Sequence, residues 1–202
     1  MEELYRRSPN LERESYDGHT QVSLETNAFT NRNIFLFGDI DEKLFYHFML
    51  QMMHLSVDET KPIQIYMSTQ GGEVNAGLAM YDLIQMCKAP IYIYCVGTVA
   101  SMGAVLLASA PKGNRYILPH GQVMIHEPLI SNGLGGSASS INKTAMTILK
   151  VRDQINAILA KHTGKSIEEI NQATDHDHYF NAKEAIEFGL CDHIINELKV
   201  EE

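Results

Sequence analysis

The chain has no tryptophan and only three cysteines among its 202 residues. Cys87, Cys95 and Cys191 lie far apart, each within an apolar segment, and no two of them form a Cys-x-x-Cys pair. This spacing argues against a disulfide framework and against the usual zinc motifs, and it is typical of reduced core cysteines. We therefore expect a core that forms without disulfides or metals, which a domain of this length can build.

Positive charge is also scarce, because 16 Lys and Arg residues stand against 25 Asp and Glu residues, for a net charge of −9. Binding to nucleic acids or anionic membranes depends on clustered Lys and Arg, so we expect no nucleic acid and no membrane as partner. The sequence has no apolar run of about 18 residues that could span a bilayer. No apolar stretch follows the charged first residues, as it would in a secretory signal. The expected location is cytoplasmic.

The chain divides into an arm and one domain. Residues 1–30 are polar and without periodic pattern, which predicts an extended or mobile N-terminal arm. From 31 to 202, strand patterns alternate with helix patterns, which predicts a single α/β domain with a mainly parallel sheet. The predicted strand at 91–96 has no polar alternation, so we expect it to be buried on both faces.

The second half of the domain carries strong helix signals. Residues 129–140 are rich in Gly and Ser and predict a loop. A long helical pattern follows over about 139–162 and stops at Gly164, a typical left-handed cap. Capping boxes at 166–169 and 181–184 predict two shorter helices.

Polar residues follow several predicted strands: Gly71-Gly72, Ser101, His126, and the segment Asp175-His-Asp-His178. Parallel sheets bind ligands where the carboxyl ends of their strands meet, so these residues define a candidate site. The segment lacks the HExxH and Cys/His spacings of zinc sites, and no phosphate-binding glycine motif occurs. We therefore expect neither a metal nor a cofactor.

Ser101 follows a predicted buried strand and heads a helix, and two interpretations fit that place. It can be a helix N-cap, or a nucleophile on a sharp strand-to-helix turn. Small residues at 100, 103 and 104 would let a substrate backbone approach. The surroundings are not Gly-x-Ser-x-Gly, which argues against an ordinary α/β-hydrolase.

His126 comes 25 residues after Ser101. It can be a hydrogen-bonded histidine at a sheet edge, or a general base whose ring a carboxylate orients. Asp175 and Asp177 are both candidates for that carboxylate, and their spacing does not choose between them. Gly71-Gly72 can be an ordinary strand-to-helix turn, or its backbone N–H groups could hold an oxyanion together with the Met102 N–H.

Four segments then stand in an order that identifies a resemblance: 71–77 (Gly-Gly-Glu-Val-Asn-Ala-Gly), 100–104 (Ala-Ser-Met-Gly-Ala), 124–128 (Met-Ile-His-Glu-Pro) and 177–185 (Asp-His-Tyr-Phe-Asn-Ala-Lys-Glu-Ala). From Asn33 to about Ile195 the chain resembles the proteolytic subunits of Clp proteases (ClpP). The resemblance implies a crotonase-like α/β fold with a protruding handle helix, the handle occupying about 129–162. It also implies that Ser101 is the nucleophile, His126 the base and Asp177 the orienting acid, with the Gly72 and Met102 N–H groups as the oxyanion hole.

The same resemblance implies an endopeptidase that hydrolyses unfolded polypeptides inside two stacked heptameric rings, as a homo- or hetero-oligomer. An AAA+ unfoldase such as ClpX, ClpA or ClpC would feed the chamber. Two residues depart from the family pattern: Gln70 where proline is usual, and His176 where arginine is usual. They suggest a divergent paralogue. The alternatives are a low-activity structural ring subunit that needs a second ClpP paralogue, and a crotonase-type acyl-CoA enzyme.

Overall fold

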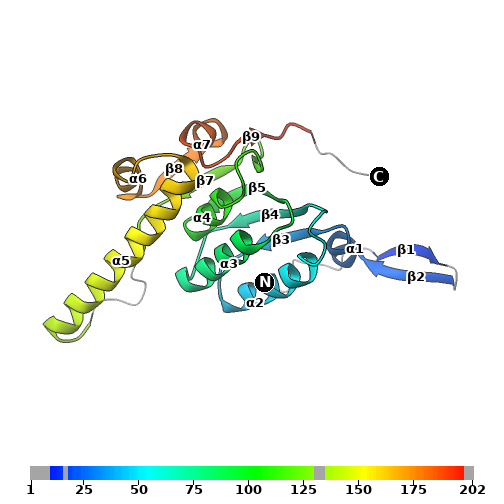
Figure 1. Ribbon diagram of the computed structural model, residues 1–202, viewed down its shortest axis with the longest axis horizontal. Coiled ribbons are helices and arrows are strands. Elements are labelled where there is room, and N and C mark those ends of the chain that lie inside the picture. Colours follow the sequence, from blue (N-terminus) through cyan, green and yellow to red (C-terminus); the bar gives the residue numbers. More distant parts are fainter. Residues whose placement is uncertain (1–9, 16–17, 130–134, 198–202) are drawn as a thin grey trace.

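The computed structural model describes residues 10–15, 18–129 and 135–197. Strands and helices alternate along most of the described chain, and this confirms the predicted α/β class (Figure 1). The strands are β1 (Asn10–Ser15), β2 (Gly18–Ser23), β3 (Asn33–Phe37), β4 (Ile63–Thr69), β5 (Ile91–Ala100), β6 (Arg115–Ile117), β7 (Gln122–Ile125), β8 (His178–Asn181) and β9 (His193–Ile194). The helices are α1 (Leu24–Thr30), α2 (Glu42–Leu55), α3 (Val74–Met86), α4 (Met102–Ala108), α5 (Ala138–Thr163), α6 (Ile167–Thr174) and α7 (Ala182–Phe188).

The main sheet has the strand order β3-β4-β5-β6-β9, and all of these neighbours run parallel. On the side away from β4, strand β5 pairs with two strands: its middle part pairs with β6 and its last three residues, Thr98–Ala100, pair with β7. Strand β7 in turn pairs antiparallel with β8. This branch brings the ends of β5, β7 and β8 together.

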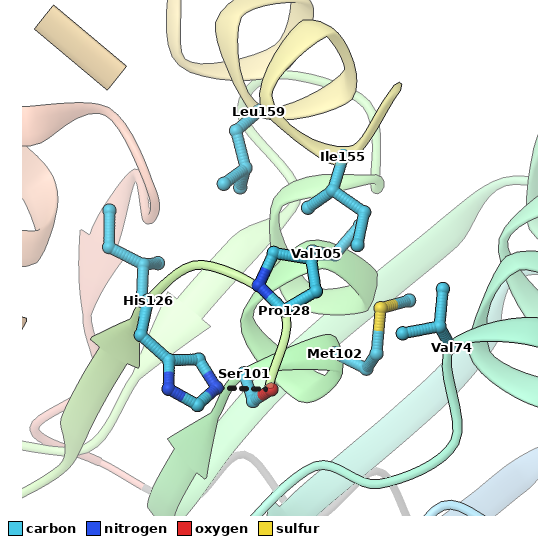
Figure 2. Close-up of a pocket in the computed structure, with 9 residues that line it drawn as sticks. Val74, Ser101, Met102, Val105, His126, Pro128, Ile155 and Leu159 are labelled. Atoms are coloured by element: carbon cyan, nitrogen blue, oxygen red, sulfur yellow. Dashed lines mark hydrogen bonds between the residues drawn. The ribbon is translucent and has the colours of Figure 1, made fainter. Parts of the chain in front are cut away.

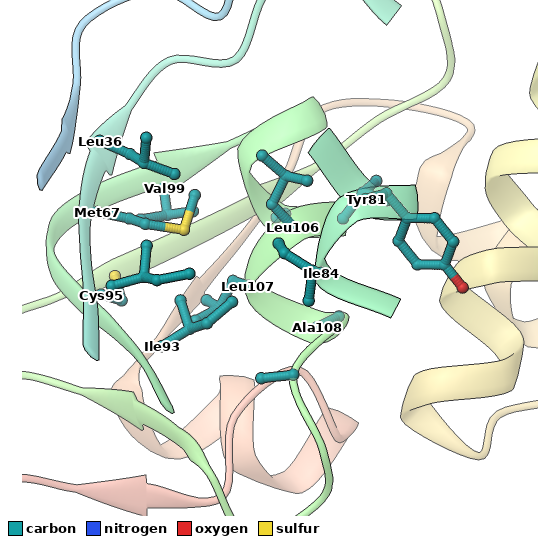
Figure 3. Close-up of a cluster of buried hydrophobic side chains, with 14 of the residues drawn as sticks. Leu36, Met67, Tyr81, Ile84, Ile93, Cys95, Val99, Leu106, Leu107 and Ala108 are labelled. Carbon is teal, nitrogen blue, oxygen red and sulfur yellow. The ribbon is translucent and has the colours of Figure 1, made fainter. Parts of the chain in front are cut away.

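The core lies between this sheet and helices α3 and α4. Figure 3 shows Leu36, Met67 and Ile93 on the strands facing Ile84, Leu106 and Leu107 on the helices. Every residue of α4 is buried, which requires the small and aliphatic side chains of this segment.

Strand β5 corrects one prediction. It is not buried on both faces, because Ile91, Ile93 and Cys95 are buried whereas Tyr92 and Tyr94 are partly exposed. Tyr94 stacks between Tyr66 of β4 and Tyr116 of β6, with ring centroids 4.7 and 5.0 Å apart. Tyrosines form this partly open face of the sheet, so the apolar character of the strand overstated its burial.

The region before Asn33 is more regular than the sequence predicts. Strands β1 and β2 form an antiparallel hairpin, and Ser23 caps α1 by accepting a hydrogen bond from the Thr26 N–H. No side-chain pattern predicts the hairpin, because its residues show no apolar alternation and the two strands pair through backbone hydrogen bonds. Residues 1–9 and the Tyr16-Asp17 pair lie outside the described residues, and the mobility of the arm stays a prediction.

Helix α5 projects from the body at the end opposite the β1–β2 hairpin (Figure 1). It begins after Ser137, whose hydroxyl accepts from the Ser140 N–H, and ends at Gly164 in the left-handed region, as predicted. Both predicted capping boxes, at Ser166 and Asn181, are present. Residues 130–134 of the predicted 129–140 loop lie outside the described residues, and α5 already begins at Ala138, within the predicted loop. Across the part of the chain that the structure describes, none of the helices has the length and apolarity to cross a bilayer.

Candidate active site

Ser101 lies between β5 and α4 in a backbone conformation that few residues adopt. Its φ is +54° and its ψ is −124°, and its hydroxyl forms no capping bond to α4. Ser101 thus occupies the N-cap position of α4, but the interpretation that its side chain caps the helix is wrong. A non-glycine residue with these angles costs about 1–3 kcal/mol, and such residues concentrate at functional sites. The Ser101 N–H donates to the Met124 carbonyl at 2.9 Å, which ties the turn to β7.

Ser101, His126 and Asp177 form a continuous hydrogen-bonded set. His126 Nε2 lies 2.9 Å from Ser101 Oγ, and His126 Nδ1 lies 3.1 Å from Asp177 Oδ1 (Figure 2 shows the first contact). The His126 side chain is 14% exposed, whereas the Asp177 side chain is 60% exposed. The imidazole is thus shielded by protein, while its carboxylate partner faces outward.

The sheet branch explains why these residues meet. Ala100 pairs with Met124 across β5 and β7, and Ile125 pairs with His178 across β7 and β8. Ser101 directly follows Ala100, and His126 directly follows Ile125. Asp177 directly precedes His178, so the strand register brings the three side chains to one place.

Of the two acids that the sequence left open, Asp177 is the one that contacts His126. Asp175 instead caps the C-terminus of α6, and its Oδ2 lies 3.3 Å from Nδ1 of the neighbouring His176. The His176 side chain is 88% exposed.

The Gly71-Gly72 turn packs directly against Ser101. Gly71 has a φ of +96°, and a Cβ at this position would lie 2.6 Å from the Ser101 Cβ. At Gly72, with a φ of +149°, a Cβ would collide with the Ile40 backbone. Only glycine fits at either position. The turn is fixed by a 3.0 Å bond from the Gly71 N–H to the buried Thr69 hydroxyl, beside Gln70.

Two backbone N–H groups beside Ser101 have no protein acceptor among the described residues. The Ile40 N–H donates to the Gly71 carbonyl, and the Glu73 N–H donates to the Ile40 carbonyl. Neither bond uses the Gly72 N–H. The Met102 N–H belongs to the first turn of α4, where no carbonyl of its own helix lies within reach. Free N–H groups beside a serine hydroxyl are the chemistry that an oxyanion requires.

An apolar pocket opens beside the Ser101–His126 pair (Figure 2). Its lining comes from α3, α4, α5, the end of β7 and the segment after it: Val74, Met102, Val105, Ile125, Pro128, Ile155 and Leu159. A pocket with this lining favours an apolar group over a charged one. Apart from Met102, none of these lining residues was a candidate from the sequence, although Ile155 and Leu159 lie four apart on one face of a predicted helix.

The remaining histidines of the candidate region have structural contacts. His178 stacks on Phe180 with ring centroids 4.2 Å apart, and His193 packs on Tyr116 at 5.1 Å. Within the described ranges, no group of three or more His, Cys, Asp or Glu side chains is arranged to hold a metal ion.

The fold and the site define a class: an α/β protein whose mostly parallel sheet brings a serine, a histidine and a carboxylate into one hydrogen-bonded set. The family model described as Clp protease matches residues 17–198, and the chain belongs to the Clp protease family. The mostly parallel sheet with flanking helices is the crotonase-like fold that the resemblance implies. Membership of this family supports a Clp-type peptidase and implies a ring-forming oligomer that works with unfoldases.

Proposed function

We propose that the protein is a serine endopeptidase subunit, with Ser101 as nucleophile, His126 as general base and Asp177 as the acid that orients His126. The observation that supports this most strongly is the Ser101–His126–Asp177 hydrogen-bonded set. Each contact joins groups that a Ser-His-Asp mechanism uses together.

In the acylation step, Ser101 Oγ attacks the substrate carbonyl carbon while His126 Nε2 takes the hydroxyl proton. The carbonyl oxygen becomes an oxyanion, which the N–H groups of Gly72 and Met102 stabilise. His126 then donates its proton to the leaving amine, and the C–N bond breaks to give an acyl-enzyme. Water attacks this ester with His126 again as base, and Ser101 is released. Asp177 accepts the Nδ1–H bond throughout and stabilises the imidazolium.

The pocket restricts which substrate side chains can bind beside Ser101. Its aliphatic lining and the Pro128 ring favour peptides with an apolar side chain next to the bond that is cleaved. The chain therefore cleaves unfolded polypeptides with a loose apolar preference.

The proposed activity requires several copies of the chain to assemble. Exposed apolar residues on the projecting part of α5, namely Ile141, Met146 and Leu149, favour association through this helix. We propose that α5 is the handle that joins two heptameric rings into a chamber, and that an AAA+ unfoldase delivers polypeptide to it. The cytoplasmic location stays a prediction.

Hydrolysis of a fluorogenic peptide with an apolar residue before the scissile bond tests the function. Wild type should hydrolyse it, and Ser101→Ala should lose at least about 1,000-fold in kcat while keeping its assembly size. Ser109→Ala is the matched control, because Ser109 caps the other end of α4. Loss of activity in Ser109→Ala alone, or equal activity in all three proteins, contradicts the proposal.

Gln70 favours a second candidate, a latent ring subunit that a paralogue activates. Its signature would be rings of wild-type protein without peptidase activity that gain Ser101-dependent activity when a second subunit is added.

A further inference from the structure

Asp177 lies in a segment with little support of its own. It belongs neither to α6 nor to β8, its side chain is 60% exposed, and among the described residues its carboxylate contacts only His126. An exposed carboxylate with one hydrogen bond is held in place mainly by its backbone. The two ends of the segment Asp175–Asp177 therefore determine where the carboxylate lies.

Both ends of the segment are connected by backbone pairing to the residues on either side of His126, Ile125 and Glu127. On one side, His178 pairs with Ile125 in the β7–β8 ladder. On the other, the Glu127 N–H donates to the Thr174 carbonyl at 2.8 Å. These anchors flank His126 directly, so a shift of Thr174 moves the segment relative to the imidazole.

Asn156 of α5 fixes the Thr174 end. Its Nδ2 donates to Asn171 Oδ1 at 2.7 Å and lies 3.3 Å from Thr174 Oγ1. Asn156 and Thr174 are each only 1% exposed. The Thr174 hydroxyl donates to the Ile170 carbonyl at 2.9 Å, which leaves its oxygen free to accept from Asn156. One buried amide thus joins α5 to the last turn of α6.

This arrangement is not the most stable choice for a buried position. Asn156 Oδ1 is buried and has no hydrogen-bond partner within the described part of the chain. An unsatisfied buried acceptor opposes stability, whereas an aliphatic side chain of similar size would not. The benefit of the amide lies in the geometry that it imposes on α6.

The same helix also shapes the pocket. Ile155 precedes Asn156, Leu159 follows it by three residues, and both line the pocket beside Ser101. Helix α5 therefore lines the pocket with Ile155 and Leu159, and it bonds through Asn156 to the last turn of α6.

We propose that Asn156 is a positioning residue for the peptidase reaction: through Thr174 it holds Asp177 against His126. The inference rests on the proposed function. It assigns Asn156 no contact with substrate or with the reacting atoms.

The first test is Asn156→Leu, which keeps the side-chain volume and removes the donor. Asn171 is exposed and can bond to water instead, so the unfolding midpoint should stay the same or rise. The kcat for the fluorogenic peptide should fall about 10- to 100-fold with little change in KM, since the displacement affects the reacting groups. Thr163→Val is the matched control, because it removes a side-chain hydrogen bond at the C-terminal end of the same helix, from the Thr163 hydroxyl to the Leu159 carbonyl. An unchanged kcat in Asn156→Leu overturns the inference.

A double-mutant cycle separates positioning from general damage. In an Asp177→Asn background, Asn156→Leu should change the rate at which a fluorophosphonate labels Ser101 by less than about twofold, because the residue that it positions is already disabled. A loss of equal size in both backgrounds, as misfolding or a lost assembly would cause, overturns the inference.

Thr174 provides a second pair of variants. Thr174→Val removes the acceptor and should lower kcat as Asn156→Leu does, whereas Thr174→Ser keeps the hydroxyl and should restore it. Equal kcat values for Thr174→Val and Thr174→Ser contradict the positioning role. If Ser101→Ala keeps the activity of wild type, the proposed function itself is wrong. That result differs from the two results that overturn only the role of Asn156, an unchanged kcat in Asn156→Leu and an equal loss in both backgrounds.

Discussion

At the scale of single residues, Ser101 has a positive φ, and the carboxylate of Asp177 lies within hydrogen-bonding distance of His126. Ser101, His126 and the glycine pair were recognisable because polar residues followed predicted strands. Spacing alone left Asp175 and Asp177 open and the family resemblance implied Asp177, whereas the register of β8 is what brings Asp177 next to His126 in the structure. The positive φ of Ser101 and the buried contacts of Asn156 depend on tertiary packing, so no local pattern could signal them.

The backbone of Ser101 leads to a stability prediction. Glycine adopts a φ of +54° without strain, so Ser101→Gly should raise the free energy of unfolding by about 1 kcal/mol relative to Ser101→Ala. Both variants lack the nucleophile, and Ser101→Ala is the control that keeps a Cβ. Denaturant unfolding at one protein concentration measures the difference. If Ser101→Gly is the less stable of the two, the strain is not real.

His162 makes stability depend on pH. Burial lowers its pKa to about 4, and the nearby charges of Lys161 and Arg115 act in the same direction. Its Nε2 lies 3.0 Å from the Tyr81 hydroxyl. The unfolded chain therefore binds a proton below about pH 6.5 that the folded protein takes up only near pH 4. Stability should be complete above pH 6.5 and decline as pH falls through this window.

His162→Gln should remove that part of the decline. Because His162 is half-exposed and solvent screens its charge, we expect an effect of about 1–2 kcal/mol between pH 7 and 4.5. Unfolding curves at the two pH values measure it, with His120→Gln, an exposed histidine, as control. A pH dependence of the same size in His162→Gln and wild type would contradict the assignment.

At the scale of elements, helices with a periodic apolar pattern and capping residues could be predicted from the sequence. Strands that pair through backbone hydrogen bonds alone could not. The long helix, its glycine cap and both capping boxes follow from side-chain patterns that act locally. The β1–β2 hairpin pairs through backbone groups that every sequence has, and the partial exposure of β5 depends on the tyrosines of its neighbours.

Arg115 joins several elements near the end of α5. Its side chain is 2% exposed, bonds to Asp192 through Nε at 2.8 Å, and donates through Nη1 to the His162 and Gly189 carbonyls. Partial burial raises the pKa of Asp192, but hydrogen bonds from Arg115 and Gly113 outweigh it, so this pKa lies below its ordinary value.

Breaking this ion pair should be costly. Arg115→Met leaves the Asp192 carboxylate without its cation and should lower the free energy of unfolding by about 3–5 kcal/mol. Asp192→Asn added to Arg115→Met should cost less than the sum of the two single changes. Denaturant unfolding of the four proteins measures the coupling, and additive losses would show that the two side chains act independently.

At the scale of the whole molecule, helix α5 and the β1–β2 hairpin project at opposite ends of the described structure (Figure 1). The projecting helix α5 exposes the apolar side chains of Ile141, Met146 and Leu149, and we propose that they contact another copy of the chain. The size of that assembly depends on contacts between copies, and the fold of one chain does not contain it.

A charge on the projecting helix tests this use of α5. Leu149→Glu should convert most of the large assembly into smaller species, because the glutamate would be buried without a partner in the interface. Thr147→Glu adds the same charge at an exposed polar position of the helix and serves as control. Sedimentation velocity gives the sizes, and an unchanged assembly in Leu149→Glu would remove α5 from the interface.

The most direct test of the central claim is to treat the assembled wild-type protein with a fluorophosphonate and locate the adduct by peptide mass spectrometry. The account predicts a single phosphonylated residue, Ser101, with labelling slowed at least about 100-fold in His126→Ala. Labelling that is absent, that falls on another residue, or that proceeds equally fast without His126 would contradict a serine nucleophile activated by this histidine.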